Sequence, residues 1–504
     1  MTAHEMDRRT LLRGAGVAGV STALTGLLGT APATAAPDVT PFDLHFSTTE
    51  RFRPFDLIAP RFVQYDSAVT PSPRASGTLV STGAGPRAPF ASVLVEVQRI
   101  DGAGAVQAGW AGGDTSVLGT LDPGAGRATI EVTVGGTTTV VASAEARVSG
   151  SFGFAVVLNE NAVTVLVDTT GTGTGWQPLV TERNGVRALI DLRVPAVLGN
   201  LDHAYGGRGD GSVRLGRVRA GYFGQVGVRD PHVVQHADGR PYVRDGKMYL
   251  TLTNAGLGFF QQAHWAVWTI DLADPTRLEQ VAILFFERDG AVLGDHAGQI
   301  VYDDRTGRFI VLMSSWGDFD FRGVHIRHAT TGANVLSGVH VIPTQRLPLP
   351  TTVSSWDPAL TRVDGRWRLA FVESEAQQPA FVFHPALAAG PVGADYAESL
   401  SRVGADTGVD QTEGTIIQRV GRSWYVFASD GDARTYPVYD LRMRKLGTLD
   451  APYGTNIPHP VLLPVGREWW LITFDGTQFA EPVLGYGGHG DLIVMRSPAP
   501  GGRR

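Results

Sequence analysis

The 504-residue sequence contains no cysteine, which excludes thiol catalysis, thiolate zinc sites and disulfide bonds. Charged residues are scarce, at 18%, and the formal net charge is −6. Without a basic excess, neither nucleic acid nor an anionic membrane surface is expected as a partner. No Asp-rich calcium loop and no His-Glu-x-x-His pattern occurs, so the sequence predicts no dedicated metal site.

Helical periodicity is also missing from the first part of the chain. Short apolar stretches alternate with a period of two and are separated by turns rich in glycine, of which the chain has 63. Examples are residues 92–98, 128–134, 138–143, 153–158 and 162–167. We expect an all-β chain in which residues 38–221 form an antiparallel β-sandwich, and this part resembles lectin-like and laminin-G-like modules. Sugar binding and a purely structural role remain open for it.

A five-fold internal repeat fills the rest of the chain. Each unit has a small polar start, an apolar strand, a turn and a second, aromatic-rich strand. These second strands lie at residues 247–254, 308–315, 366–373, 423–429 and 468–475. Repeats of about 50 residues built from short strands are typical of β-propellers. The sequence therefore predicts a five-bladed β-propeller over residues 222–500.

Three of the repeat units open on a carboxylate: Asp230 in Arg-Asp-Pro-His-Val, Asp357 in Trp-Asp-Pro-Ala-Leu and Glu413 in Thr-Glu-Gly-Thr-Ile. The first strands of propeller blades line the central channel, so these three acids are expected to converge at equivalent repeat positions. Glycoside hydrolysis needs one protonated acid at the leaving oxygen and one ionised carboxylate on the opposite face. A third acid near them raises the proton donor's pKa by like-charge repulsion. Each acid taken alone could instead start a strand or cap a turn.

The order Asp, Asp, Glu on units one, three and four, with Asp-Pro in the first and Glu-Gly in the last, resembles the five-bladed furanosidase superfamily. Glycoside hydrolase family 43 is the nearest match, over roughly residues 222–496. The resemblance implies that Asp230 is the general base, Asp357 the pKa modulator and orienter, and Glu413 the general acid of an inverting enzyme. Thr415 stands where that family usually has proline, so a sister family with a different sugar is an alternative.

Other residues at the starts of the repeat units are candidates for sugar contacts. His296 could bind substrate hydroxyls, and Trp316, Trp356 and Phe259 could stack on sugar faces, with Trp356 the favoured platform. Structural roles are the alternative for each. His459 opens the fifth unit, where we expect a buried, hydrogen-bonded imidazole. In some members of family 43 a histidine at this place helps to hold a cation on the propeller axis, which makes His459 the one candidate near a metal.

Residues 1–36 are predicted to be a targeting segment. Asp7-Arg8-Arg9-Thr10-Leu11-Leu12-Arg13 precedes a stretch without charge that is rich in Ala, Gly and Leu, as in twin-arginine export signals. An uncleaved membrane anchor is the alternative. We expect a secreted protein with no stable membrane insertion after cleavage.

The sequence thus predicts a secreted glycoside hydrolase for a furanoside-type oligosaccharide or polysaccharide, such as arabinan or fructan, without an obligatory cofactor. Two alternatives use the same features. One is a carbohydrate-binding propeller without catalysis, and the other is a transglycosylase or fructotransferase with a sugar hydroxyl as acceptor. The sugar, the anomer, endo or exo action and the oligomeric state are not specified by the sequence.

Overall fold

The computed structural model describes residues 39–53, 60–68, 78–173, 175–223, 227–351, 353–478 and 489–499. The predicted export signal lies outside these residues. The expectation of an all-β chain is confirmed, because strands dominate and the two α-helices, α1 (Asn184–Leu189) and α2 (Pro195–Leu198), are short. No helix in the described ranges has the length and apolarity needed to cross a membrane.

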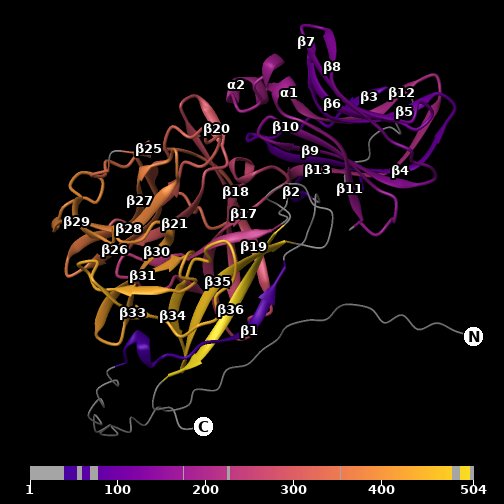
Figure 1. Cartoon of the computed structure of the whole chain (residues 1–504). Coiled ribbons are helices and arrows are strands. Elements are labelled where there is room, and N and C mark those ends of the chain that lie inside the picture. Colours follow the sequence, from indigo (N-terminus) through magenta and orange to yellow (C-terminus); the bar gives the residue numbers. More distant parts are fainter. Residues whose placement is uncertain are drawn as a thin grey trace, which may run out of the picture. The chain divides into compact units, whose positions relative to one another are not determined.

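Two six-stranded sheets, here called the N-terminal sheet pair, lie between residues 60 and 223 (Figure 1). In spatial order the first contains β11 (Trp176–Glu182), β10 (Ala162–Asp168), β9 (Phe152–Asn159), β4 (Phe90–Asp101), β13 (Ser212–Phe223) and β2 (Pro60–Asp66). The second contains β3 (Leu79–Ser81), β12 (Asp202–Gly209), β5 (Gly104–Gly112), β6 (Thr115–Asp122), β7 (Arg127–Val134) and β8 (Thr137–Glu145). Both sheets contribute to one core of Val, Leu, Ile, Phe and Trp110. Alternating strands bury one face in this core, as their period-two pattern requires.

Five more sheets follow, here called the five-sheet ring (Figure 1). The first sheet has β14 (Val228–Val233), β17 (Lys247–Asn254), β18 (His264–Asp271), β19 (Leu278–Arg288) and β20 (Ala291–Leu293), with β16 (Val243–Arg244) and β24 (Gly338–Pro343) attached. The second has β15 (Gln235–His236), β21 (His296–Asp303), β22 (Arg308–Ser314), β23 (Ile326–Thr331) and β25 (Gln345–Arg346). The third has β26 (Ser354–Val363), β27 (Arg366–Ala376), β28 (Val382–Val392) and β29 (Ser401–Ala405).

The fourth sheet has β30 (Thr412–Val420), β31 (Ser423–Asp430), β32 (Pro437–Tyr439) and β33 (Lys445–Thr448). The fifth has β34 (Val461–Val465), β35 (Glu468–Gln478), β36 (His489–Pro498) and β1 (Ser47–Phe52). The inner strands β14, β21, β26, β30 and β34 each contact the next, and β34 contacts β14. This cyclic contact brings the starts of distant sequence units together. The aromatic-rich second strands of the repeat are β17, β22, β27, β31 and β35.

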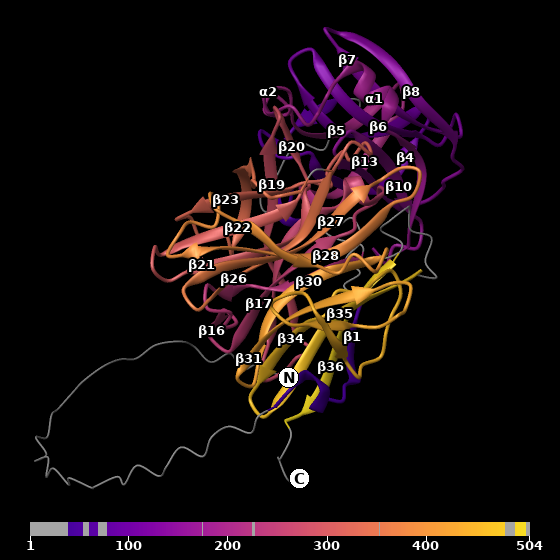
Figure 2. The same ribbon diagram turned by 60° about the vertical axis from the view of Figure 1, so that its left-hand side comes forward.

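The fifth sheet takes its outer strand from the N-terminal part of the chain. β1 pairs antiparallel with β36, and the two lie side by side in both ribbon views (Figure 1; Figure 2). The sequence predicts that residues 38–221 form the sandwich, and this boundary is wrong at its start. β1 is polar and mostly exposed, so no periodicity in its own sequence indicates which sheet it joins. The pairing that determines its place spans more than 440 residues.

Arg51, near the end of β1, and Arg53, directly after it, form ion pairs with Asp491 of β36. The buried carboxylate of Asp491 accepts hydrogen bonds from Arg51 Nε at 2.5 Å and from Arg53 Nε at 2.9 Å. We expect Asp491→Asn to lower the free energy of unfolding by about 1–3 kcal/mol, because hydrogen bonds to a charged group are lost and both guanidiniums are partly exposed. Urea denaturation measures this change. Asp101→Asn, which breaks an exposed pair with Arg99, is the matched control and should change stability by less than about 0.5 kcal/mol. Equal effects of the two variants would contradict the stabilising role of these ion pairs.

Candidate active site

The inner strands of the first four sheets share one backbone irregularity. In each, the pairing with the second strand shifts register, which marks a β-bulge near the strand start. One residue in each bulge has left-handed backbone angles: Asp230 (φ 50°), Ala297 (φ 52°), Asp357 (φ 50°) and Gly414 (φ 69°). Aspartate and glycine tolerate this conformation better than most residues. The bulge therefore redirects side chains at the same level of four successive sheets.

Glu413 is not structurally equivalent to the two aspartates. It stands one residue before the bulge of β30, and its partner in β31 is Ser429. The residues at this place in the other sheets are Arg229, His296 and Trp356. The expectation that all three acids occupy equivalent positions is wrong for Glu413 by one residue. A longer glutamate side chain one residue earlier still reaches the same point.

The three acids converge on the ring of His459. Its Nε2 lies 3.4 Å from Asp357 Oδ2, 3.7 Å from Asp230 Oδ1 and 4.0 Å from Glu413 Oε1. The side chains of Asp230 and His459 are each 9% exposed, that of Asp357 is 5% exposed and that of Glu413 is 22% exposed. His459 thus sits beneath three carboxylates, and Glu413 is the one nearest to solvent.

Hydrogen bonds from neighbouring sheets orient these carboxylates. The Gly414 N–H donates to Asp357 Oδ2 at 2.9 Å, and the Trp356 indole N–H donates to Glu413 Oε2 at 3.1 Å. The Thr415 hydroxyl donates to the Asp357 carbonyl at 2.7 Å. Glycine at position 414 is required twice, by its left-handed backbone and because a Cβ would lie 2.5 Å from the His459 ring. The fourth sheet therefore orients Asp357 of the third sheet, and the third sheet orients Glu413 of the fourth.

The charges at the site shift three pKa values. Burial raises the pKa of Asp357 to about 8; His459 opposes this shift, while Glu413 and Asp230 add to it. Burial alone would lower the pKa of His459, but the carboxylates of Asp357, Asp230 and Glu413 raise it to about 9. Burial alone would raise the pKa of Asp230, yet the imidazolium of His459 and the guanidinium of Arg229 hold it below its ordinary value. The pKa values of Asp357 and His459 depend on each other, because each group is shifted by the charge of the other, while Asp230 stays ionised at neutral pH.

A pocket of about 190 Å³ opens above the acids. Among the expected sugar-contact residues, His296, Trp316 and Trp356 line it. Phe259 does not belong to the lining; it is 57% exposed and packs on its neighbour Phe260, which does line the pocket. The further lining residues are Arg229, Asp230, Ala297, Asp357, Phe381, Glu413 and His459.

Trp356 does not offer a stacking face, contrary to the expectation from sequence. It is 1% exposed and packs edge-on against Trp316 and Phe383, at 5.5 and 5.2 Å between ring centroids. Its polar contribution is the hydrogen bond to Glu413. Trp316 and Phe381 are only half-buried and present aromatic surface to the pocket.

The histidines of the pocket have defined protons. His296 Nε2 donates to the Phe260 carbonyl at 3.0 Å, which leaves Nδ1 to accept from Thr253 at 3.4 Å. A protonated imidazole has no free lone pair for a metal, so the cationic form of His459 is itself the positive charge among the acids. Within the described ranges, no group of His, Asp and Glu side chains has the arrangement of a metal site.

The hydrogen bond between Trp356 and Glu413 yields a prediction. Trp356→Phe keeps an aromatic ring and removes only the indole donor. We expect kcat/KM on the substrate to fall by about 2- to 10-fold, because the hydrogen bond that orients Glu413 is lost and such a bond to a neutral group contributes about 0.5–1.5 kcal/mol. Steady-state kinetics measure the change, and Trp367→Phe, a buried residue that lies over Arg362 and not in the pocket, is the control. Unchanged kinetics in Trp356→Phe would contradict the role of this contact.

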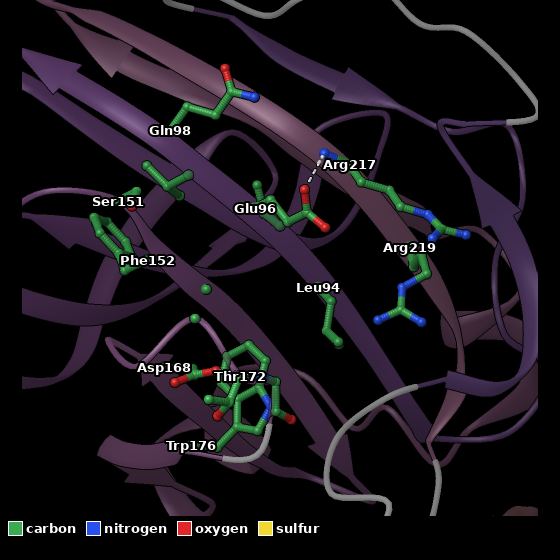
Figure 3. Close-up of a pocket in the computed structure, with 15 residues that line it drawn as sticks. Leu94, Glu96, Gln98, Ser151, Phe152, Asp168, Thr172, Trp176, Arg217 and Arg219 are labelled. Atoms are coloured by element: carbon green, nitrogen blue, oxygen red, sulfur yellow. Dashed lines mark hydrogen bonds between the residues drawn. The ribbon is translucent and has the colours of Figure 1, made fainter.

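A second, larger pocket of about 430 Å³ lies on the N-terminal sheet pair (Figure 3). Its two lining acids are Glu96 and Asp168. Glu96 accepts the backbone N–H of Arg217 at 3.1 Å, and Asp168 accepts the backbone N–H groups of Thr170 at 2.9 Å and Gly173 at 2.6 Å. The Asp168 carboxylate is thus used by its own loop, and this pocket lacks the converging acids of the first.

Comparisons with known proteins found similar solved structures, and no match of any other kind. No protein-family model and no curated protein matches the sequence. Among solved structures, a GH43_1 enzyme from Xanthomonas citri covers 54% of this chain and 87% of its own, at 17% identity and a TM-score of 0.38. Inulosucrase from Halalkalicoccus jeotgali bound to kestose covers 55% and 85%, at 14% identity and a TM-score of 0.41. Zg3597, a family 117 glycoside hydrolase of Zobellia galactanivorans, covers 56% and 88%, at 13% identity and a TM-score of 0.40. Similarities this distant do not assign a function, which must be inferred from the site itself.

Proposed function

We propose that this protein is a secreted glycoside hydrolase that cleaves furanoside-type bonds by general acid–base catalysis. The single observation that supports this function is the convergence of Asp230, Asp357 and Glu413 on His459 in one solvent-reaching pocket. We interpret the five-sheet ring as a five-bladed β-propeller and the N-terminal sheet pair as a lectin-like sandwich.

Asp230 is the proposed general base. Its lowered pKa keeps it ionised at neutral pH, as a base that activates water must be. Glu413 is the proposed general acid, because its side chain is the most exposed of the three and faces an entering sugar. Glu413 Oε2 accepts the Trp356 N–H, and this hydrogen bond orients the carboxyl group.

Asp357 is the proposed orienter. Its raised pKa keeps a proton on the carboxyl group at neutral pH, and its Oδ2 accepts the Gly414 N–H, so Oδ1 carries the proton and can donate to a sugar hydroxyl. A competing assignment follows from the same pKa: Asp357 could be the proton donor to the leaving oxygen. Its 5% exposure argues against this assignment, because the donor must touch the leaving group.

The geometry limits the separation of base and acid. Asp230 Oδ1 and Glu413 Oε1 lie 3.7 and 4.0 Å from the same nitrogen, so their separation cannot exceed these two distances laid end to end. This limit allows the about 5–5.5 Å of retaining enzymes and only the lower part of the roughly 6.5–9.5 Å range of inverting ones. We propose inversion, because a base on a different sheet from the acid leaves room for water. Nuclear magnetic resonance of the first-formed anomer tests this stereochemistry.

The lining of the pocket suits a neutral sugar ring. Aromatic surface from Phe260, Trp316 and Phe381 lies beside the polar groups, an arrangement suited to one sugar ring with its apolar face and hydroxyls. The proposed substrates are therefore neutral furanosides in arabinan- or fructan-like chains.

The test of the function is a substrate panel. The purified full-length protein is incubated with arabinans, fructans, xylans and aryl furanosides, and released reducing ends and product sizes are measured. Hydrolysis of at least one furanoside is expected. Saturable binding with no released product would favour a carbohydrate-binding protein instead, and transferred or cyclic products would favour a transferase. The proposed secretion is tested by locating the protein in the culture medium of cells with an intact and a disabled twin-arginine pathway.

A further inference from the structure

One wall of the sugar pocket is a short loop after β22. Trp316 lines the pocket and packs edge-on against Phe319, at 5.1 Å between ring centroids. Phe260, from the first sheet, packs edge-on against Trp316 at 5.6 Å. The Phe319 N–H donates to the Trp316 carbonyl at 3.2 Å, so the loop forms a tight turn. The placement of Trp316 therefore depends on what holds residues 316–319.

Asp318, within this turn, binds three arginines on and beside α1, in the segment that connects β11 and β12 of the N-terminal sheet pair. Arg183 Nη2 donates to Asp318 Oδ1 at 2.6 Å, Arg187 Nη1 approaches the same oxygen at 3.4 Å, and Arg193 Nη1 donates to Oδ2. Arg193 is buried, with its side chain 7% exposed. Asp318 also has left-handed backbone angles (φ 51°), which few residues adopt without support. The Asp318 carboxylate therefore connects the pocket loop to the arginines of the N-terminal sheet pair.

The five-sheet ring anchors the same loop from its other side. The Gly317 N–H donates to the buried Asp295 at 2.9 Å, and Arg288 Nη2 donates to the Gly317 carbonyl at 2.7 Å. The Asp318 N–H reaches the Gln261 carbonyl at 3.4 Å, which connects the loop to the segment carrying Phe260. Asp318 is therefore the link between these contacts and the arginines of the sheet pair.

A buried glutamate explains why Asp318 receives all three arginines. Glu160, in the β9–β10 turn, is 1% exposed and faces the loop close to Gly317. Burial and the nearby charge of Asp318 raise the pKa of Glu160 to about 8, despite Arg193 and Arg183, which lower it. At neutral pH Glu160 is therefore uncharged, and Asp318 is the carboxylate that pairs with the guanidinium groups of the three arginines.

Apolar packing makes this contact between the sheet pair and the ring extensive. Phe90 of β4 stacks on Phe285 of β19 at 5.1 Å, and Tyr222 of β13 contacts the same ring at 5.7 Å. The Val292 N–H donates to the Arg193 carbonyl at 2.8 Å. The part of the chain that carries the arginines is therefore packed firmly against the first sheet of the five-sheet ring.

We propose that Asp318 is a positioning residue, through which Arg183, Arg187 and Arg193 of the sheet pair hold Trp316 and Phe260 in place as the wall of the sugar pocket. The inference rests on the proposed function of that pocket. It gives the N-terminal sheet pair a role in substrate binding at the catalytic site, distinct from binding sugar on its own surface.

Asp318→Asn tests the proposal in the full-length protein. Asparagine tolerates the left-handed backbone, so the change removes mainly the charge that binds the arginines. We expect KM to rise about tenfold while kcat changes less than about twofold, because Trp316 and Phe260 contact the sugar and transfer no proton. Asp320→Asn is the matched control, since the Asp320 carboxylate, on the same loop, contacts exposed Arg322. The control should keep the wild-type KM.

A double-mutant cycle separates positioning from general loss of stability. Arg183→Gln should raise KM by itself, and the double variant should show no rise beyond that of Asp318→Asn, because Asp318→Asn already removes the contact with Arg183. Hydrogen exchange of residues 315–322 should become faster in Asp318→Asn and remain unchanged in Asp320→Asn. Wild-type KM in Asp318→Asn, or rises in KM that simply multiply in the double variant, would overturn the proposal.

The outcomes also distinguish this inference from the proposed hydrolysis. If the wild type binds sugar without turnover, only the hydrolytic function fails, and the dissociation constant replaces KM with the same expected change of about tenfold. If the wild type turns over substrate and Asp318→Asn is kinetically normal, only the positioning role fails. A wild type that neither binds nor cleaves any of the sugars overturns both.

Discussion

Glu413→Gln should lower kcat on an alkyl furanoside or oligosaccharide by about 10²- to 10⁴-fold, the usual contribution of a general acid. On an aryl furanoside with an acidic phenol as leaving group, the loss should be far smaller, because that leaving group needs no protonation. The physical basis is the position of Glu413, which is the most exposed of the three acids and closest to an entering sugar. Steady-state kinetics on both substrate types measure the difference.

Asp357→Asn is the matched comparison. It removes a buried acid whose proton we assign to sugar orientation, so its loss of kcat should be similar for both leaving groups. If the loss of kcat depended on the leaving group in Asp357→Asn but not in Glu413→Gln, Asp357 would be the general acid and Glu413 the orienter. The urea midpoint of unfolding of both variants should equal that of the wild type, which shows that the loss of kcat is not caused by unfolding.

His459→Asn should cost about 3–5 kcal/mol of the free energy of unfolding at pH 7, because it leaves the buried carboxylates without their cation. The folded-state pKa of His459 is about 9, above the ordinary 6.5, so its stabilisation is complete below pH 6.5 and is lost as the pH rises through 9. In the variant, lowering the pH toward 4 protonates the carboxylates and relieves their repulsion. The difference between wild type and variant should therefore be largest at about pH 5 to 6.5 and should shrink as the pH rises from 6.5 to 9.

Urea denaturation at about pH 4.5, 6, 7.5 and 9.5 checks this profile. His236→Asn is the control, because His236 pairs with the half-exposed Asp304 at 3.0 Å and should contribute less than about 1 kcal/mol. A stability difference for His459→Asn that is constant over the whole pH range would contradict the charge assignment. Wild-type stability of the variant at pH 7.5 would contradict it as well.

The sequence predicts the strands of this chain better than their partners. Period-two alternation and aromatic-rich repeats locate β17, β22, β27, β31 and β35, because these properties are local. The pairing of β1 with β36 joins residues at opposite ends of the chain, and the mostly exposed polar sequence of β1 carries no signal for it. Long-range pairing of this kind depends on which edge the folded sheets leave free.

In the candidate site, too, local features are visible in the sequence and long-range ones are not. The acids are visible in the sequence because each opens a repeat unit. The one-residue offset of Glu413 is not visible, because it depends on a bulge in which Gly414, and not an acid, takes the left-handed backbone. The role of His459 follows from three distances to carboxylates, none of them local. A glycine directly after an acid, at a place where the other units have the acid itself in the bulge, is the signal that could have indicated the offset.

Phe259 and Phe260 show the limit for adjacent aromatic residues. Both are phenylalanines in one loop, and composition does not distinguish them. Phe260 turns into the pocket because the short 3₁₀ turn Phe260–Gln262 starts there and its carbonyl binds His296. Asp318 could not be recognised from sequence either, since its arginines lie more than 120 residues away.

A crystal structure of Glu413→Gln with an uncleaved furanoside oligosaccharide tests the central claim most directly. One furanose ring should lie in the pocket above His459, with the glycosidic oxygen beside the side chain at position 413 and the Asp230 carboxylate on the opposite face of the anomeric carbon. An oligosaccharide bound solely in the pocket of the N-terminal sheet pair, or a ring above His459 whose glycosidic oxygen points away from position 413, would contradict it.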